Sequence, residues 1–114
     1  MYTILNQKGE ADAYNQNSMI MDLNQEQVHG ILIGDCFYGK KDHMIGKIFN
    51  KTAYLINGEI VGKVVQNTEY KNVALKKANM QTAWEILSNI KNHTSTWIEE
   101  TSKWSSKPIL FHLL

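Results

Sequence analysis

Three glycines, Gly30, Gly46 and Gly62, follow one another at intervals of sixteen residues. An apolar residue stands two positions before each glycine and another stands two positions after it: Val28, Met44 and Ile60 before, and Leu32, Ile48 and Val64 after. Alternation with a period of two is typical of a β-strand with one buried face. Because the pattern recurs at a constant interval, we expect the first part of the chain to be successive copies of one small unit.

The last copy predicts a hairpin. Asn57-Gly58 separates two apolar runs, residues 52–56 and 59–65, and this dipeptide is the strongest short signal for a type I′ turn. A two-residue loop would place Ala53 opposite Gly62 and would fix which side chains share a face. The residues then expected on the buried face are Ala53, Leu55, Ile60, Gly62 and Val64.

The periodic glycines have two structural interpretations. A missing side chain on a buried face lets neighbouring backbones approach closely, and we expect this at Gly30, Gly46 and Gly62. A glycine within a strand can also mark a β-bulge. Neither interpretation gives the glycines a catalytic role.

An earlier segment, residues 2–16, has the features of a diverged fourth copy. Gly9 stands in its turn, and Ala13 stands near the glycine position, displaced by seventeen residues instead of sixteen. Single hairpins are marginally stable in water, so four copies must bury their apolar faces against one another. We expect either an arrangement around a pseudo-fourfold axis or a short wound sheet.

Residues 2 to 65 resemble a family of small bacterial proteins described as a four-fold β-flower, which is built from Tyr-x-x-x-Gly-x-x-x-Gly hairpins. The residues that carry the resemblance are Phe37-Tyr38 with Gly46-Lys47, and residues 54–58 with Gly62-Lys63. The second copy departs from the pattern, since Asp22 stands in the tyrosine register and His29-Gly30 replaces the glycine-lysine pair. The resemblance implies a fold, and it brings no activity and no catalytic residue with it.

The period changes after Val65. Apolar or small residues then recur at alternating steps of three and four, which predicts a helix; they are Met80, Ala83, Leu87, Ile90, Thr94, Trp97, Thr101 and Trp104. Thr96 and Glu99 have the spacing of a capping box, which favours two helices over one long rod. The expected fold class is α+β in a single domain, residues 1–114. We divide it into a hairpin-repeat body (1–68), one or two C-terminal helices (74–106) and an apolar tail (107–114).

Large aromatic side chains in the C-terminal part are candidates for a partner interface. Trp97, Trp104 and Phe111 would either pack against the β body or form a surface for a protein partner or a second copy of the chain. The tail is more apolar than chain ends usually are, so we expect it to be covered. It would pack in the same chain as a short strand or turn, or in an oligomer interface.

Composition excludes several classes of protein. At 114 residues the chain forms about one domain, and its formal net charge is +1. All twelve basic residues are lysine, which argues against specific nucleic-acid binding, because arginine makes the bidentate contacts. The start of the chain has no signal-peptide pattern, and no stretch reaches the ~20 apolar residues that cross a bilayer, so we expect a cytoplasmic protein without membrane contact.

The candidates for catalysis are few. Cys36 is the only cysteine, and a thiolate beside an imidazole would be a minimal covalent catalyst. A small hydrolase or transferase would need Asp35, Cys36 and His29 or His43 to meet at one rim of the hairpins. The spacing favours a structural Cys36, and we expect no metal and no cofactor. The alternative is a metal or acid-base site at a rim where adjacent hairpins would bring together Asp35, Asp42, His29 and His43.

The repeat also predicts a surface. Lys47 and Lys63 share one register, and with Tyr38 and Tyr54 they could form an aromatic and cationic face for a carbohydrate or a single-stranded polymer. The alternative is a solvated sheet face. We expect a non-catalytic binding or assembly module that acts through its helices, its tail or this outer face, and that can form a homo-oligomer.

Overall fold

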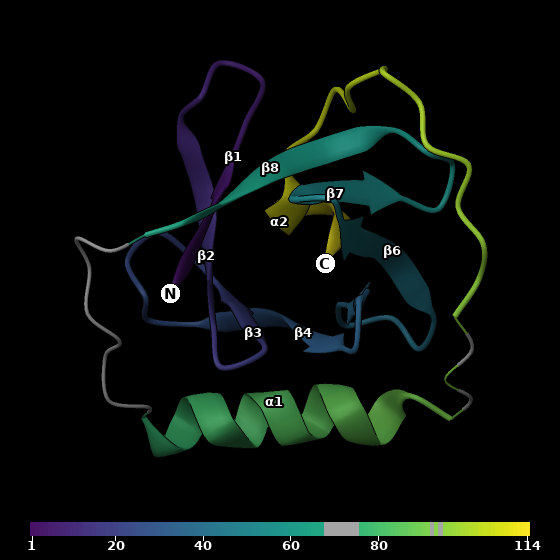
Figure 1. Cartoon of the computed structure of the whole chain (residues 1–114). Helices are drawn as coiled ribbons and strands as arrows, with labels where there is room; N and C mark the ends of the chain where they lie inside the picture. The colour runs from purple at the N-terminus through teal and green to yellow at the C-terminus, as the bar shows by residue number, and fades with distance from the viewer. Residues whose placement is uncertain (68–75, 92, 94) are drawn as a thin grey trace.

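A computed structural model describes residues 1–67, 76–91, 93 and 95–114. Its main body is a closed barrel of eight antiparallel strands that follow one another in chain order (Figure 1). The strands are β1 (Tyr2–Leu5), β2 (Ala11–Gln16), β3 (Met19–Met21), β4 (Val28–Ile33), β5 (Cys36–Tyr38), β6 (Met44–Phe49), β7 (Thr52–Leu55) and β8 (Ile60–Gln66). The helices are α1 (Lys77–Asn89) and α2 (Ile109–His112).

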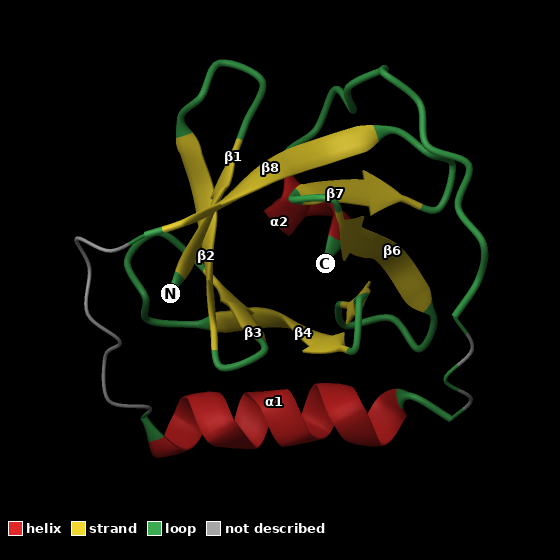
Figure 2. Cartoon of the chain, in the orientation of Figure 1, coloured by secondary structure: helices red, strands yellow, loops and turns green. Residues whose placement is uncertain are grey.

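The α+β class is confirmed, with hairpin strands first and the helices after them. Strand β8 returns to β1, where Ile4 pairs with Val64 and Tyr2 with Gln66, and this pairing closes the sheet. Closure leaves no free strand edge. Figure 2 shows the two helices in different places, with α1 outside the ring of strands and α2 within it. No helix among the described residues is long and apolar enough to span a membrane.

The barrel has two unlike ends. At one end, the short-turn end, strands are joined by two-residue turns at 17–18, 34–35 and 50–51. In two of these turns both residues have positive φ, as type I′ turns require, namely Asn17 with Ser18 and Asn50 with Lys51; at 34–35 only Gly34 does. At the other, the long-loop end, the connections 6–10, 22–27, 39–43 and 56–59 are longer.

The turn at Asn57-Gly58 is a tight reversal, but the type I′ prediction is wrong. The Leu55 amide donates to the Glu59 carbonyl at 2.8 Å, and the Gly58 amide donates to the Leu55 carbonyl at 2.9 Å. Within this turn only Gly58 has a positive φ, of 88°. The loop closed by the bond from Leu55 to Glu59 therefore has three residues, 56–58: a type I turn followed by a glycine in the left-handed region. The third loop residue changes the register beyond it.

This change corrects one predicted core position. Ala53 pairs with Gly62 as expected, but Tyr54 pairs with Ile60 and leaves Val61 as an extra, bulged residue. A bulge lets two successive residues face the same side of a strand. Val61 joins Gly62 on the inner face, and Ile60, which we expected there, lies on the outer face.

Both interpretations of the periodic glycines, close packing and a β-bulge, apply to this structure. Register shifts in the pairing of β3 with β4 and of β5 with β6 leave His29 and Ile45 unpaired, directly before Gly30 and Gly46. A Cβ on Gly30 would lie 2.6 Å from the carbonyl oxygen of Tyr38, and one on Gly46 would lie 2.6 Å from the Phe37 ring. Each glycine is thus both next to a bulge and in close contact with the neighbouring strand.

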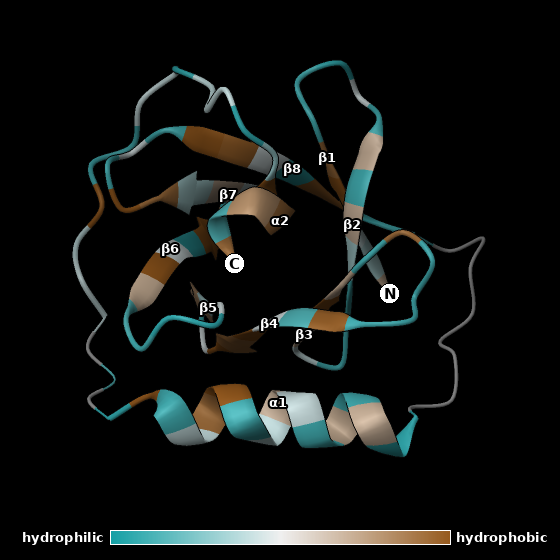
Figure 3. Cartoon of the chain, turned by 180° about the vertical axis from the view of Figure 1, so that it is seen from behind, coloured by the Kyte–Doolittle hydropathy of each residue, from teal (hydrophilic) through white to brown (hydrophobic). Residues whose placement is uncertain are grey.

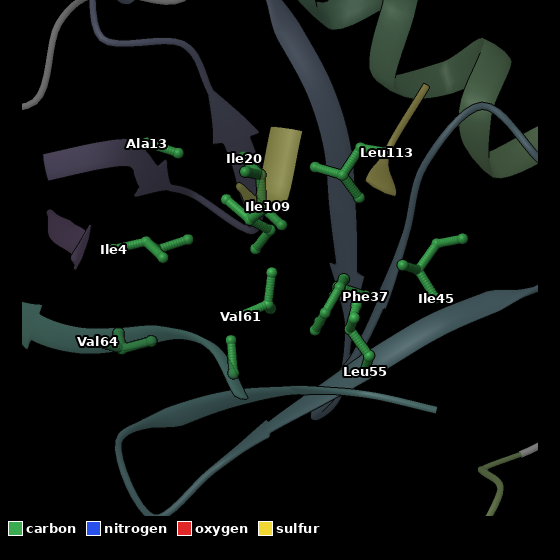
Figure 4. Packing of buried hydrophobic residues seen from close by; sticks show 11 residues of the cluster. Ile4, Ala13, Ile20, Phe37, Ile45, Leu55, Val61, Val64, Ile109 and Leu113 are labelled. Carbon is green, nitrogen blue, oxygen red and sulfur yellow. The ribbon is translucent and has the colours of Figure 1, made fainter. Parts of the chain in front are cut away.

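One hydrophobic cluster fills the barrel. Its buried members are Ile4, Ala13, Ile20, Phe37, Ile45, Ala53, Leu55, Val61, Val64, Ile109 and Leu113. Two of these, Ile109 and Leu113, come from the apolar tail, which closes the long-loop end as the short helix α2. Figure 4 shows both among the side chains that point inward from the strands. Ile109 and Leu113 of the tail are therefore covered within their own chain, in and directly after a short helix, whereas Phe111 and Leu114 stay exposed.

A second cluster lies outside the barrel wall. Its buried members are Met19, Met21, Val28, Ile31, Cys36, Tyr38, Met44, Tyr54, Ile60, Ile86 and Ile98. Helix α1 covers part of this wall with Ile86 and lies alongside β3 and β4, with apolar and polar bands on its surface (Figure 3). Ile98 and the half-buried Trp104 cover another part. The outer hairpin face is thus largely an interior surface.

The predicted second helix is wrong. Residues 95–107 are not helical, and positions 74, 75, 92 and 94 of the predicted segment lie outside the described residues. This part of the chain runs beside the start of β8, where the Ile60 amide donates to the Lys103 carbonyl and the Ser105 amide to the Ile60 carbonyl. The segment is rich in Ser and Thr, which favour bonds to non-helical backbone, and Thr101 Oγ1 donates to the Gly58 carbonyl at 2.9 Å.

Candidate functional site

The two tyrosines of the predicted binding face lie under the C-terminal segment. Tyr38 and Tyr54 are buried in the outer cluster. The Tyr54 hydroxyl donates to Glu100 Oε2 at 3.0 Å, and the Tyr38 hydroxyl shares a hydrogen bond with His93 Nδ1. Burial raises the pKa of both phenols, and Glu100 raises that of Tyr54 further. Their polar ends hold the returning chain against the barrel.

The two lysines of that face are more accessible. Lys47 is half-buried and pairs with Tyr54 across β6 and β7. Lys63 is exposed, and its Nζ donates to Thr52 Oγ1 at 3.1 Å. The structure brings Lys47 next to one tyrosine of the predicted face, but it leaves neither phenol ring free for stacking.

The three aromatics of the predicted interface are dispersed. Trp97 is 85% exposed and Phe111 is half-exposed, whereas Trp104 packs against the outer cluster. Trp104 also lines a hollow of about 560 Å³ at the long-loop end, with Asp12 and residues 105–108. Burial raises the pKa of the Asp12 carboxyl.

The catalytic candidates do not converge. Cys36 is fully buried, its Sγ lies 3.5 Å from Asp35 Oδ1, and burial raises the pKa of its thiol. His29 lies 3.7 Å from Asp22, while His43 lies on the surface beside Asp42. Thiolate chemistry requires the opposite environment, an accessible sulfur with a lowered pKa. Across the described part of the chain, no three His, Cys, Asp or Glu side chains are placed to hold a metal ion.

Helix α1 carries an exposed apolar face, which includes part of the predicted helical stripe. Met80, Trp84 and Leu87 are 49%, 66% and 40% exposed, and their spacing places them on one side of the helix. A groove of about 410 Å³ runs between this side and β3–β4, where Met19, Ile31 and Ile33 contribute to its wall. The predicted stripe contained Met80 and Leu87, but periodicity alone cannot tell a buried stripe from an exposed one.

A further cavity opens at the short-turn end of the barrel. It has a volume of about 630 Å³. Its lining residues are Tyr2, Asn15, Leu32, Gly34, Asp35, Ile48, Phe49, Asn50, Lys51, Val64, Val65 and Gln66. The apolar members Leu32, Ile48 and Val64 follow each periodic glycine by two positions, so the repeat contained the signal for this ring. The repeat did not indicate that one end of the barrel stays open.

Comparison with models of known protein families, with curated proteins and with solved structures found no significant match. The geometry of the chain itself therefore carries the functional argument.

Proposed function

We propose that this protein is a non-catalytic assembly module that pairs with a second copy of itself through the exposed face of α1. The observation that carries the proposal is the row of Met80, Trp84 and Leu87, three large apolar side chains in water beside an apolar groove. The tyrosines of the outer hairpin face and the side chains of Ile109 and Leu113 in the tail are instead buried within the chain.

The row and the groove are suited to a symmetric contact. In a two-fold dimer the same patch meets itself, so Trp84 of each copy can enter the groove of the other. Tryptophan is enriched among the residues that dominate binding energy, because its large rigid surface loses little entropy on burial. The groove walls contributed by Met19 and Ile31 supply apolar surface for it.

Light scattering after gel filtration tests the proposal. The wild-type chain should have the mass of a dimer, and Trp84→Lys should reduce it to that of a monomer while circular dichroism stays unchanged. Trp97→Lys is the matched control, since Trp97 is even more exposed but lies outside α1. A monomeric wild type, or dissociation by Trp97→Lys and not by Trp84→Lys, would show the proposal to be wrong.

We also infer that the barrel consists of four variants of one hairpin with a sixteen-residue period, as in the β-flower family. Three register shifts, at His29, Ile45 and Val61, support this because they recur at that interval, and Asp12 is bulged in the same way before Ala13. If the copies are equivalent, Ala13→Gly should be tolerated, whereas Gly46→Ala should destabilise the fold. Thermal unfolding of both variants distinguishes them.

A further inference from the structure

We propose that the short-turn end of the barrel binds one small neutral molecule with an apolar body and a hydroxyl group. Eight-stranded barrels are just wide enough to be filled by side chains or to hold one small ligand. Here α2 fills the long-loop end, and a cavity of about 630 Å³ remains at the other, within the size range of ligand sites in proteins.

The cavity wall has a ring of equivalent positions. The side chains of Leu32, Ile48 and Val64 pack within or against the inner cluster. The backbone amide of each donates a hydrogen bond to the carbonyl of the last residue in the preceding short turn: Ser18 at 2.8 Å, Asp35 at 2.7 Å and Lys51 at 2.9 Å, respectively. Asn15 takes the corresponding place in the first hairpin, two residues after Ala13 as the others are two residues after a glycine. The ring therefore consists of three aliphatic side chains and one amide.

The amide is the unusual member. Asn15 Oδ1 is buried and has no hydrogen-bond partner among the described residues, although the side chain lines the cavity. An unsatisfied buried polar group costs stability that a leucine at the same place would not. The Asn15 side chain as a whole is only half-buried and lines the cavity, so rotation of its amide can bring a polar atom to a ligand there. A hydroxyl both donates and accepts, so it can pair with either end of an amide.

The rim indicates the charge of the ligand. Asp35 and Lys51 are exposed and both line the mouth, so the site offers one charge of each sign and favours neither anions nor cations. Tyr2, which pairs with Asn15 across β1 and β2, adds an aromatic wall beside the amide. A neutral ligand keeps its apolar body against Leu32, Ile48 and Val64 and its hydroxyl near Asn15.

The test compares two probes on two proteins. The probes are 2-naphthol and 2-methylnaphthalene, which differ only in a hydroxyl or a methyl group. The proteins are the wild type and Asn15→Leu, which completes the aliphatic ring and leaves no orphaned polar atom.

Binding is followed by fluorescence titration, and the site by NMR shifts of the Ile48 and Val64 methyl groups. We expect saturable binding of 2-naphthol with shifts at both residues. Its preference over 2-methylnaphthalene should fall roughly threefold to tenfold in Asn15→Leu, the range of a typical hydrogen bond.

Two variants locate the site independently. Ile48→Trp should fill the mouth and abolish binding of both probes, whereas Trp84→Lys, on the groove beside α1, should leave both affinities unchanged. The proposal is overturned if neither probe saturates the wild type, if the preference is the same in Asn15→Leu, or if Trp84→Lys removes binding. A monomeric wild type would not affect it, because the dimer contact lies on α1.

Discussion

Gly39 lies directly against the last turn of the chain, so that a Cβ added to it would be 2.6 Å from the Cα of Leu113. The neighbouring Lys40 amide donates to the Leu113 carbonyl at 3.0 Å. On the adjoining strand, a Cβ at Gly30 would be 3.1 Å from both terminal methyl groups of Leu113. Two glycines thus make the space into which the tail inserts, and one backbone hydrogen bond holds it there.

Gly39→Ala should therefore weaken the packing of the tail in the barrel and lower the stability of the fold. The added methyl group meets backbone, which cannot move as a side chain can, so we expect a loss of about 1–3 kcal/mol in the free energy of unfolding. Urea denaturation followed by tryptophan fluorescence measures it. Lys40→Ala is the control and should change stability by less than about 0.5 kcal/mol, since the lysine side chain is exposed. Equal stabilities of the two variants would mean that the tail does not depend on this contact.

Truncation of the two final leucines should have unequal effects. Leu113 is buried in the barrel and Leu114 is 59% exposed. We expect Leu113→Ala to cost about 2–5 kcal/mol in unfolding free energy, because it leaves a cavity in the inner cluster. Leu114→Ala should be nearly neutral. Similar losses for both would contradict the placement of α2 inside the barrel.

Stability should decrease below about pH 6.5 through His112. Burial lowers the pKa of this imidazole below its ordinary 6.5, against a weaker opposite effect of Glu59, and its Nε2 lies 2.9 Å from Ser105 Oγ. The unfolded chain therefore takes up a proton near pH 6.5 that the folded chain does not yet bind. The stabilising contribution is complete above that pH and is lost as the pH falls through the folded pKa. His112→Gln should make urea stability between pH 7 and pH 5 less dependent on pH; an unchanged dependence would exclude His112 as a source.

The Cys36 thiol should react slowly in the native state. It is fully buried, and burial raises its pKa, so the thiolate is scarce and inaccessible at neutral pH. Labelling with a disulfide reagent at pH 7.5 should be much slower than in 8 M urea, because reaction of a buried thiol requires the structure to open. Rapid labelling of the folded protein would reopen the possibility of a nucleophilic cysteine.

The sequence predicted the hairpins better than their assembly. Gly9 and Gly58 mark two of the long loops. The pairing of Ala53 with Gly62 was predicted from a two-residue loop, and it is found because the bulge at Val61 offsets the third loop residue. The same reasoning placed Ile60 on the wrong face, because a three-residue loop and a two-residue loop share the Asn-Gly signal. One additional residue in a loop reverses the direction of every side chain up to the bulge that compensates for it.

The candidate sites were predicted less well, for a related reason. Tyr38 and Tyr54 are on the outer face, as the register implied, but that face is covered by residues more than forty positions later in the chain. Trp97 and Trp104 fit a helical stripe by spacing, yet their segment pairs with β8 instead. Exposure depends on what else packs against a surface, which local periodicity does not encode.

By itself, the amino-acid sequence determined the alternation of apolar side chains and the change from strand to helix after residue 65, since each depends on neighbours along the chain. Only the tertiary structure decided that the strands close into a ring, that the tail enters one end of it against two glycines, and that Asn15 Oδ1 at the other end has no hydrogen-bond partner among the described residues. Those features arise from contacts between residues far apart in sequence, whose free energy depends on the whole packed arrangement.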